Sequence, residues 1–194
     1  AKPASTADTI SQNLVRTTFK KKREALRHLL RSQDIQNAVI FCNRKRDIST
    51  LLSSMKRHGF SATGLHGDMT QSARLAALDE FKNGQISLLV ASDVAARGLD
   101  IPSVSHVFNF DVPSNAEDYV HRIGRTGRAG RHGHAFTLIA GEDDEKAILA
   151  IEKLTGRPIP VLSDTDWQSK KEHSTEVAGK SAKKHRQSRT PNKP

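Results

Sequence analysis

The sequence predicts an α/β domain in which helices cover both faces of a central, mostly parallel sheet. Short apolar runs alternate with amphipathic helical patterns along most of the chain. Most of these runs are almost continuously apolar, which is typical of strands buried on both faces. This alternation also favours right-handed crossovers between parallel strands. The predicted strands, in chain order, are NLVRTTF, AVIFC, FSATGLH, ISLLVAS, VSHVFNF and HAFTLIA.

The helical patterns between the strands place apolar side chains three or four residues apart, as on the buried face of a helix. The first three predicted helices span residues 20–31, 44–58 and 70–82. The side chains that we expect to face the core from these helices are Leu26, Leu29, Leu30, Ile48, Leu51, Leu52, Met55, Leu75, Leu78 and Phe81.

Two later helices are indicated by signals at their ends. Ser114 and Glu117 predict a capping box at the start of one helix, and Gly124 is expected to end it. The other spans about residues 143–154, with acidic residues at its positive end and Gly156 just beyond its last turn. Ligands of parallel sheets bind in loops at the carboxyl ends of the strands, so we expect the chemistry there.

Composition predicts one folded domain of residues 10–162 after a lead-in of residues 1–9. Residues 163–194 are expected to form a flexible, disordered basic tail, because they hold few apolar and many basic side chains. Of the net charge of +10, residues 168–194 contribute +6, which favours a polyanionic partner such as nucleic acid. No apolar run is long enough to span a bilayer, and the single cysteine, Cys42, fits a reducing compartment. We therefore expect a soluble, cytoplasmic protein.

Two of the predicted loops hold polar side chains suited to a nucleic-acid backbone or a nucleotide. LHGDMTQSAR leads into a helix on which Gln71 and Arg74, three residues apart, share a face and are able to meet one phosphate. ASDVAARGLDIPSV exposes polar side chains around Gly98, where a glycine lets backbone approach a ligand. In this loop Ser92 is able to donate to phosphate and Asp100 to accept from a ribose hydroxyl.

The segment HRIGRTGRAG contains arginines and glycines at a repeated spacing of three. Its glycines break the helix, so Arg125 and Arg128 are expected on a turn with free guanidinium groups, and arginine suits bidentate phosphate binding. A basic surface loop or structural ion pairs are the alternatives. We favour phosphate recognition.

The chain has no G-x-x-x-x-G-K-[ST] loop, the usual phosphate cradle of parallel α/β nucleotide hydrolases. The acids of LIAGEDDE fit a helix N-terminus better than a metal, and His132 with His134 lack further ligands, so no metal site is predicted. Arginines without a cradle are explained if they act as arginine fingers on a nucleotide bound elsewhere.

Four segments, AVIFCNRKR, GLHGDMTQSAR, ASDVAARGLDIP and DYVHRIGRTGRAGRHGHAFTL, in this order and spacing closely resemble the second RecA-like domain of DEAD-box RNA helicases. The resemblance covers roughly residues 10–160. It implies a three-layer RecA-like domain and ATP-dependent unwinding or remodelling of RNA duplexes. It also implies ATP with Mg²⁺, bound mainly by a separate N-terminal RecA-like domain, as the nucleotide.

The resemblance implies a role for individual residues. Arg125 and Arg128 correspond to the fingers that reach the γ-phosphate of ATP. His121 and Arg122 correspond to residues that touch the acidic motif across the cleft, and Asp100 to the residue that accepts from the ATP ribose. The residues that correspond to RNA contacts are Asn43, Arg44, Gln71, Arg74, Ser92 and Gly98, with Ser92 standing where the family commonly has threonine.

The family's first domain, with its phosphate loop and Asp-Glu-Ala-Asp box, is absent from the 194 residues. The chain is therefore expected to be part of a longer, monomeric helicase and to be inactive as an ATPase by itself. A stand-alone RNA-binding module or RNA chaperone without ATPase activity is the main alternative. The scarcity of aromatic residues (5%) gives a base-stacking platform little support. Half of a DNA helicase of the same superfamily fits the fold but fits HRIGRTGR less well.

Overall fold

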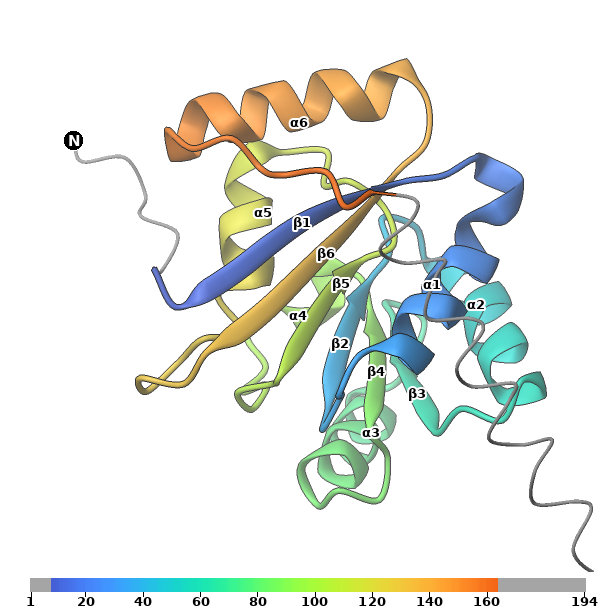
Figure 1. The fold of residues 1–194 in the computed structure, drawn as a ribbon. Helices are drawn as coiled ribbons and strands as arrows, with labels where there is room; N and C mark the ends of the chain where they lie inside the picture. The colour runs from blue at the N-terminus through green and yellow to red at the C-terminus, as the bar shows by residue number, and fades with distance from the viewer. Residues whose placement is uncertain (1–7, 164–194) are drawn as a thin grey trace, which may run out of the picture. The chain divides into compact units, whose positions relative to one another are not determined.

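The computed structural model describes residues 8–163, which form a single six-stranded sheet with helices on both faces (Figure 1). The strand order is β1-β6-β5-β2-β4-β3, and every pairing among these strands is parallel. The prediction of a central parallel sheet is therefore confirmed. The strands are β1 (Ile10–Arg16), β2 (Ala38–Phe41), β3 (Ala62–Leu65), β4 (Leu88–Ala91), β5 (His106–Asn109) and β6 (Gly133–Ile139).

The helices connect these strands by crossovers that run first in one direction along the sheet and then in the other. α1 and α2 belong to connections that run from β1 towards β3, whereas α3, α4 and α5 belong to connections that run back, so right-handed crossovers place the two groups on opposite faces. α6 packs beside α5 (Figure 1). The helices are α1 (Lys22–Ser32), α2 (Lys45–Arg57), α3 (Gln71–Lys82), α4 (Asp93–Ala96), α5 (Ala116–Ile123) and α6 (Glu142–Thr155), with a short 3-10 turn, η1 (Phe19–Lys21), before α1.

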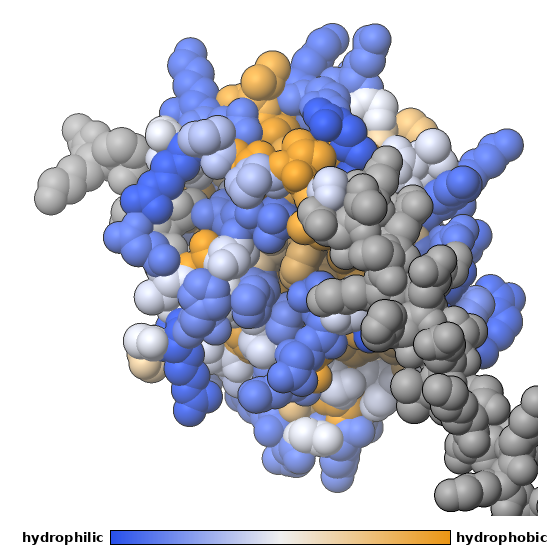
Figure 2. Space-filling view, in the orientation of Figure 1, coloured by the Kyte–Doolittle hydropathy of each residue, from blue (hydrophilic) through white to orange (hydrophobic). Residues whose placement is uncertain are grey.

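The central strands make up the core. Every residue of β2, β4 and β5 is buried, as the continuous apolar sequences of β2 and β4 predict, whereas β5 also buries the polar side chains of His106 and Asn109. Cys42 is also buried, and burial raises the pKa of its thiol far above the usual range. On the face seen in Figure 2, hydrophilic residues surround small apolar areas.

Several local predictions need correction. The first strand begins at Ile10, three residues before the predicted start, because β1 pairs with β6 along its whole length. Leu75 is 46% exposed on α3, so that helix turns only Leu78 and Phe81 of the predicted trio inward. The cap of α5 is Asn115, whose side chain accepts from the backbone N–H of Glu117, in place of the predicted Ser114 capping box.

Other features agree with the prediction, were not predicted, or concern residues outside the described range. Gly124 ends α5, and Gly156 ends α6 with a φ of 70° in the left-handed region that favours glycine. α4 was not predicted, since its four residues are too short to show a helical period. The proposed lead-in (residues 1–9) and basic tail (residues 163–194) fall almost wholly outside the described residues.

Candidate nucleotide and RNA interface

The arginine loop, residues 124–130, lies at the amino-terminal edge of the sheet. The Arg125 carbonyl accepts from the Val104 N–H at 3.0 Å, just before β5 begins. The Thr126 hydroxyl is buried and donates to the carbonyls of Val104 and Ser105, at 2.5 and 3.1 Å. The expectation that all the candidate site residues follow strand ends is therefore wrong for this loop, because α5 returns the chain to the other edge before β6 starts.

Close contact with β1 fixes the middle of the arginine loop. Gly127 has a φ of 69°, and its carbonyl accepts from the Thr9 hydroxyl at 2.8 Å. A Cβ on Gly127 would lie 2.5 Å from Cγ1 of Ile10. The glycine is thus required both by its backbone conformation and by the space available. The two arginines that flank it project from a rigidly attached turn.

Arg125 and Arg128 lie close to each other and to Asp100. Burial, and then the neighbouring charge of Arg128, lower the pKa of Arg125, whereas the charge of Asp100 acts in the opposite direction. Arg128 Nε donates to the carbonyl of Gly124 at the end of α5, at 2.6 Å. Neither arginine forms an ion pair with any acidic side chain of residues 8–163. Two uncompensated guanidinium groups beside an exposed carboxylate can bind a phosphate chain and a sugar hydroxyl.

His121 and Arg122 are adjacent in sequence but point in different directions. His121 is exposed on α5, where its Nδ1 lies 3.9 Å from the carboxylate of Asp118. Arg122 is 1% exposed, which argues against its predicted contact across a cleft. Its Nε and Nη2 donate to the Asp93 carboxylate at 2.7 and 2.6 Å. The Arg122 guanidinium is therefore satisfied inside the domain.

The remaining partners of Arg122 come from the ends of β2 and β5. Its Nη1 donates to the carbonyl of Asp111 at 2.8 Å and more weakly to Asn109 Oδ1, at 3.3 Å, while Nη2 donates to Asn43 Oδ1 at 2.8 Å. The guanidinium also lies over the Phe41 ring, 5.1 Å from its centroid. This buried network was not predicted. The sequence gives one signal for this network: Asp93 in ASD and Asp111 in FNFD each follow an apolar strand.

The structure brings the candidate RNA residues to the carboxyl-terminal edge, at the ends of β2, β3 and β4. Gln71 is exposed on the first turn of α3, where the Thr70 side chain caps the helix. Arg74 is half-buried, and its Nε has no hydrogen-bond partner among the described residues. Lys45 and Asp68, 2.9 Å apart, join the loop after β2 to the loop after β3. Exposed polar side chains from these neighbouring segments, Lys45, Asp68 and Gln71, therefore lie at the same edge of the sheet.

Two of the predicted RNA contacts, Asn43 and Ser92, form hydrogen bonds within the fold. The Asn43 amide group is used inside the fold, since Oδ1 accepts from Arg122 and Nδ2 donates to the Val112 carbonyl. Ser92 is buried and caps α4 by accepting from the Ala95 N–H at 3.3 Å. Arg44 is exposed, and Gly98 has a φ of 73° with open space where a Cβ would be. Asn43 is also exposed, so of these four residues only Ser92 is buried.

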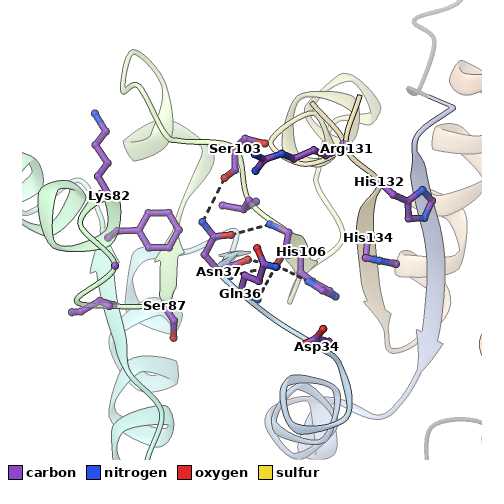
Figure 3. A pocket seen from close by; sticks show the side chains of 16 residues that line it. Asp34, Gln36, Asn37, Lys82, Ser87, Ser103, His106, Arg131, His132 and His134 are labelled. Atoms are coloured by element: carbon purple, nitrogen blue, oxygen red, sulfur yellow. Dashed lines mark hydrogen bonds between the residues drawn. The ribbon is translucent and has the colours of Figure 1, made fainter. Parts of the chain in front are cut away.

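A cavity of about 690 Å³ opens beside the arginine loop at the amino-terminal edge (Figure 3). In it Asn37 accepts from the Ser105 N–H at 2.9 Å, and the His106 and His134 rings stack with centroids 4.8 Å apart. Burial lowers the pKa of His106 to about 4, with a further contribution from His134, while Asp34 acts in the opposite direction. In the described part of the chain, no three His, Cys, Asp or Glu side chains are grouped so as to hold a metal ion.

A parallel sheet with an arginine loop at one edge and a polar surface at the other defines a RecA-like helicase domain. The family model for the helicase conserved C-terminal domain matches residues 21–130. The chain belongs to this family, and within it to the C-terminal domains of DEAD-box RNA helicases. None of the helices between residues 8 and 163 has the length and hydropathy that a membrane span requires.

The curated relatives are bacterial helicases that are much longer than this chain. The chain is 46% identical over 160 residues to the DEAD-box ATP-dependent RNA helicase CshA of Bacillus subtilis, which covers 82% of this chain and 32% of that protein. It is 44% identical to the ATP-dependent RNA helicase CshA of Listeria monocytogenes, covering 84% of this chain and 31% of that protein. The chain thus spans about a third of the length of these relatives.

Solved structures show the same fold. The chain superposes with a TM-score of 0.75 on Escherichia coli SrmB bound to the regulator RraA, at 34% identity, covering 81% of this chain and 93% of that one. For the C-terminal domain of Dbp5 the TM-score is 0.78 and the identity 31%, covering 88% and 99%. Saccharomyces cerevisiae Dbp5 bound to RNA and ADP-BeF3 gives a TM-score of 0.77 at 31% identity, covering 88% of this chain and 46% of that one.

Proposed function

We propose that this chain is the C-terminal half of an ATP-dependent RNA helicase that unwinds or remodels RNA duplexes. In this proposal a separate N-terminal RecA-like domain cradles ATP and its Mg²⁺, and Arg125 and Arg128 reach the transferred phosphoryl group as arginine fingers. Asp100 accepts a hydrogen bond from the ribose. The proposal also takes the protein to act in the cytoplasm, as a monomer.

One observation carries this proposal. Arg125 and Arg128 stand on a turn anchored to the sheet by Thr126 and Gly127, and no carboxylate in residues 8–163 pairs with either guanidinium. Structural arginines are satisfied within the fold, as Arg122 is. Arginines that are held on a fixed turn and have no ion-pair partner suit the stabilisation of charge that develops on a phosphoryl group.

RNA is the proposed substrate of the opposite edge. Arg44, Gln71 and Arg74 would contact the backbone, and Gly98 would let the main chain approach it. Asn43 and Ser92 would act by holding the shape of these loops. His121, exposed on α5, would face the N-terminal domain, whereas the buried Arg122 would position α5 behind it. Relatives named ATP-dependent RNA helicases, and Dbp5 bound to RNA and ADP-BeF3, support this assignment.

The isolated chain provides the first test. We expect it to hydrolyse no ATP, because the sequence encodes no phosphate cradle. The measurement is steady-state phosphate release by the highly purified 194-residue chain with RNA present. Sustained turnover that disappears in the Arg125→Ala variant would show that the chain holds a complete active site, and the proposed division between two domains would be wrong.

A further inference from the structure

A second cavity, of about 520 Å³, lies at the carboxyl-terminal edge, between η1, the start of α1, α2 and the ends of β2 and β5. Leu51 and Phe110 form its apolar part. Lys22 is buried there, with its Nζ 2.7 Å from Asp111 Oδ1 and 4.7 Å from the centroid of the Phe110 ring. The charge of Lys22 is therefore already compensated, and the ligand chemistry of this cavity depends on the residues around its mouth.

Phe19 gives this cavity an exposed aromatic wall. The Phe19 residue is 74% exposed, although an aromatic side chain normally buries most of its area. One edge of the ring faces Gly141, where an added Cβ would lie 3.4 Å from Cε2 of Phe19. Other exposed apolar residues, such as Val94 and Leu149, do not line this cavity. Phe19 thus offers an open ring to a ligand.

Three cations surround the same cavity. Lys20, Arg23 and Arg44 line it, and none of their side chains forms an ion pair or hydrogen bond within residues 8–163. Its two acidic residues are compensated, since Asp111 pairs with Lys22 and Asp47 lies 3.6 Å from Arg46. The cavity is therefore net positive and favours an anionic ligand.

The strand order places this cavity in line with the proposed RNA surface. Along the carboxyl-terminal edge, the loops after β3, β4 and β2 hold the candidate RNA residues, and β5, β6 and β1 follow in the same direction. The cavity begins at Arg44, after β2, and ends at Phe19, after β1. A strand that crosses the first three loops and continues would therefore meet Phe19.

We propose that this cavity binds a further nucleotide of single-stranded RNA, with its base stacked on Phe19 and its phosphate between Lys20, Arg23 and Arg44. An aromatic face combined with uncompensated cations is the chemistry by which single strands are bound without sequence preference. The inference rests on the proposed RNA function of the adjacent loops. An acidic peptide would also meet the cations, but the open ring and the continuity with those loops favour a nucleotide.

The test is a binding series with single-stranded oligouridylates of increasing length and the 194-residue chain. Phe19→Ala should raise the Kd for long oligonucleotides by about 5-fold to 150-fold, the range for losing one stacked base, and leave the shortest unaffected. Phe19→Trp should restore binding. Leu149→Ala is the matched control, because it removes an exposed apolar side chain on α6, outside the cavity. A long oligonucleotide carrying photoreactive 4-thiouridine should cross-link to Phe19.

Three outcomes would overturn the inference. If Phe19→Ala binds long oligonucleotides like the wild type while Arg74→Ala binds them weakly, the RNA surface stands and this cavity is not part of it. If Arg74→Ala and Phe19→Ala are both without effect, the proposed RNA function fails as well. If Phe19→Ala weakens binding of a glutamate-rich peptide but not of RNA, the cavity is a peptide site.

Discussion

Arg122 on α5 and Asp93 at the start of α4 form a two-pronged ion pair, with Nε to Oδ1 at 2.7 Å and Nη2 to Oδ2 at 2.6 Å. The pair ties the loop that contains Gly98 and Asp100 to the helix that leads into the arginine loop. The same guanidinium contacts Asn43 after β2. One buried side chain thus connects the proposed RNA surface with the proposed nucleotide surface.

Arg122→Ala should lower the free energy of unfolding by about 3 kcal/mol. Removing one partner of a buried pair costs about 3–5 kcal/mol, and the lower end applies because the Asp93 side chain is 22% exposed. Arg122→Lys should recover only part of the loss, since an ammonium group cannot donate in this fork geometry. Urea unfolding measures the effect. Arg97→Ala is the control, because Arg97 is an exposed residue that pairs with Asp118. Equal free energies of unfolding for Arg97→Ala and Arg122→Ala would contradict the structural role of Arg122.

Gly127→Ala and Gly130→Ala separate the two reasons for glycine in the arginine loop. Both residues have a positive φ, but only at Gly127 would the new methyl group overlap Ile10, since nothing lies within 4 Å of that position at Gly130. The strain of a left-handed backbone costs about 1–2 kcal/mol in either variant. Overpacking should add about 1–3 kcal/mol for Gly127→Ala alone. Thermal melts that show equal losses for the two variants would mean that the contact with β1 is not formed.

The burial of His106 predicts a pH-dependent stability. Its folded pKa of about 4 lies below the ordinary value of 6.5, so between these values the unfolded chain binds more protons than the folded chain. The contribution of neutral His106 to the free energy of unfolding is fully present above pH 6.5 and is lost as the pH falls towards 4. This contribution amounts to at most about 3 kcal/mol. His106→Phe should make the free energy of unfolding less dependent on pH in this range, while keeping the ring stack with Phe108 and Phe136.

The measurement for His106 is the difference in unfolding free energy between wild type and variant across pH 4 to 6.5, which cancels the carboxylates common to both. His121→Gln removes an exposed histidine and serves as the control. If the free energy of unfolding changes with pH in the same way for wild type and His106→Phe, His106 is accessible to protons in the folded protein.

Deleting residues 168–194 should weaken RNA binding and make its salt dependence shallower. The segment contains eight basic and two acidic residues, and phosphate contacts by basic side chains release counterions. Few of its residues are apolar, so the melting temperature should change little. Binding titrations over a range of salt concentrations test this prediction. A salt slope that does not change would show that the segment makes no phosphate contacts.

The sheet was predictable because its buried strands are continuous apolar runs, as in the segments that became β2 and β4. The same logic failed for Leu75, whose periodic position on α3 does not reveal that this side of the helix faces solvent. The turn that carries Arg125 and Arg128 was predictable from the glycines around it, although Arg125 is half-buried and Arg128 alone is exposed. The burial of Arg122 was not, because its partners come from three separate segments, at the ends of β2, β4 and β5, that only the sheet order brings together.

In the proposed function, Arg125 and Arg128 stabilise charge on a transferred phosphoryl group. Their contribution should grow in the transition state, so substitution lowers kcat far more than ATP affinity. Arginine fingers account for on the order of 10³ or more in rate, and a lysine does not replace the planar guanidinium donor. Arg131→Lys, also exposed and just beyond the loop, is the matched control and should behave nearly as wild type.

The most direct measurement is RNA-stimulated ATP hydrolysis by the proposed two-domain helicase, at saturating ATP and RNA, for wild type, Arg128→Lys and Arg131→Lys. We expect a kcat that is strongly reduced in Arg128→Lys and close to wild type in Arg131→Lys. A near-normal kcat for Arg128→Lys, together with a loss in Arg131→Lys, would contradict this expectation and assign the glycine-spaced arginines to the fold or to RNA.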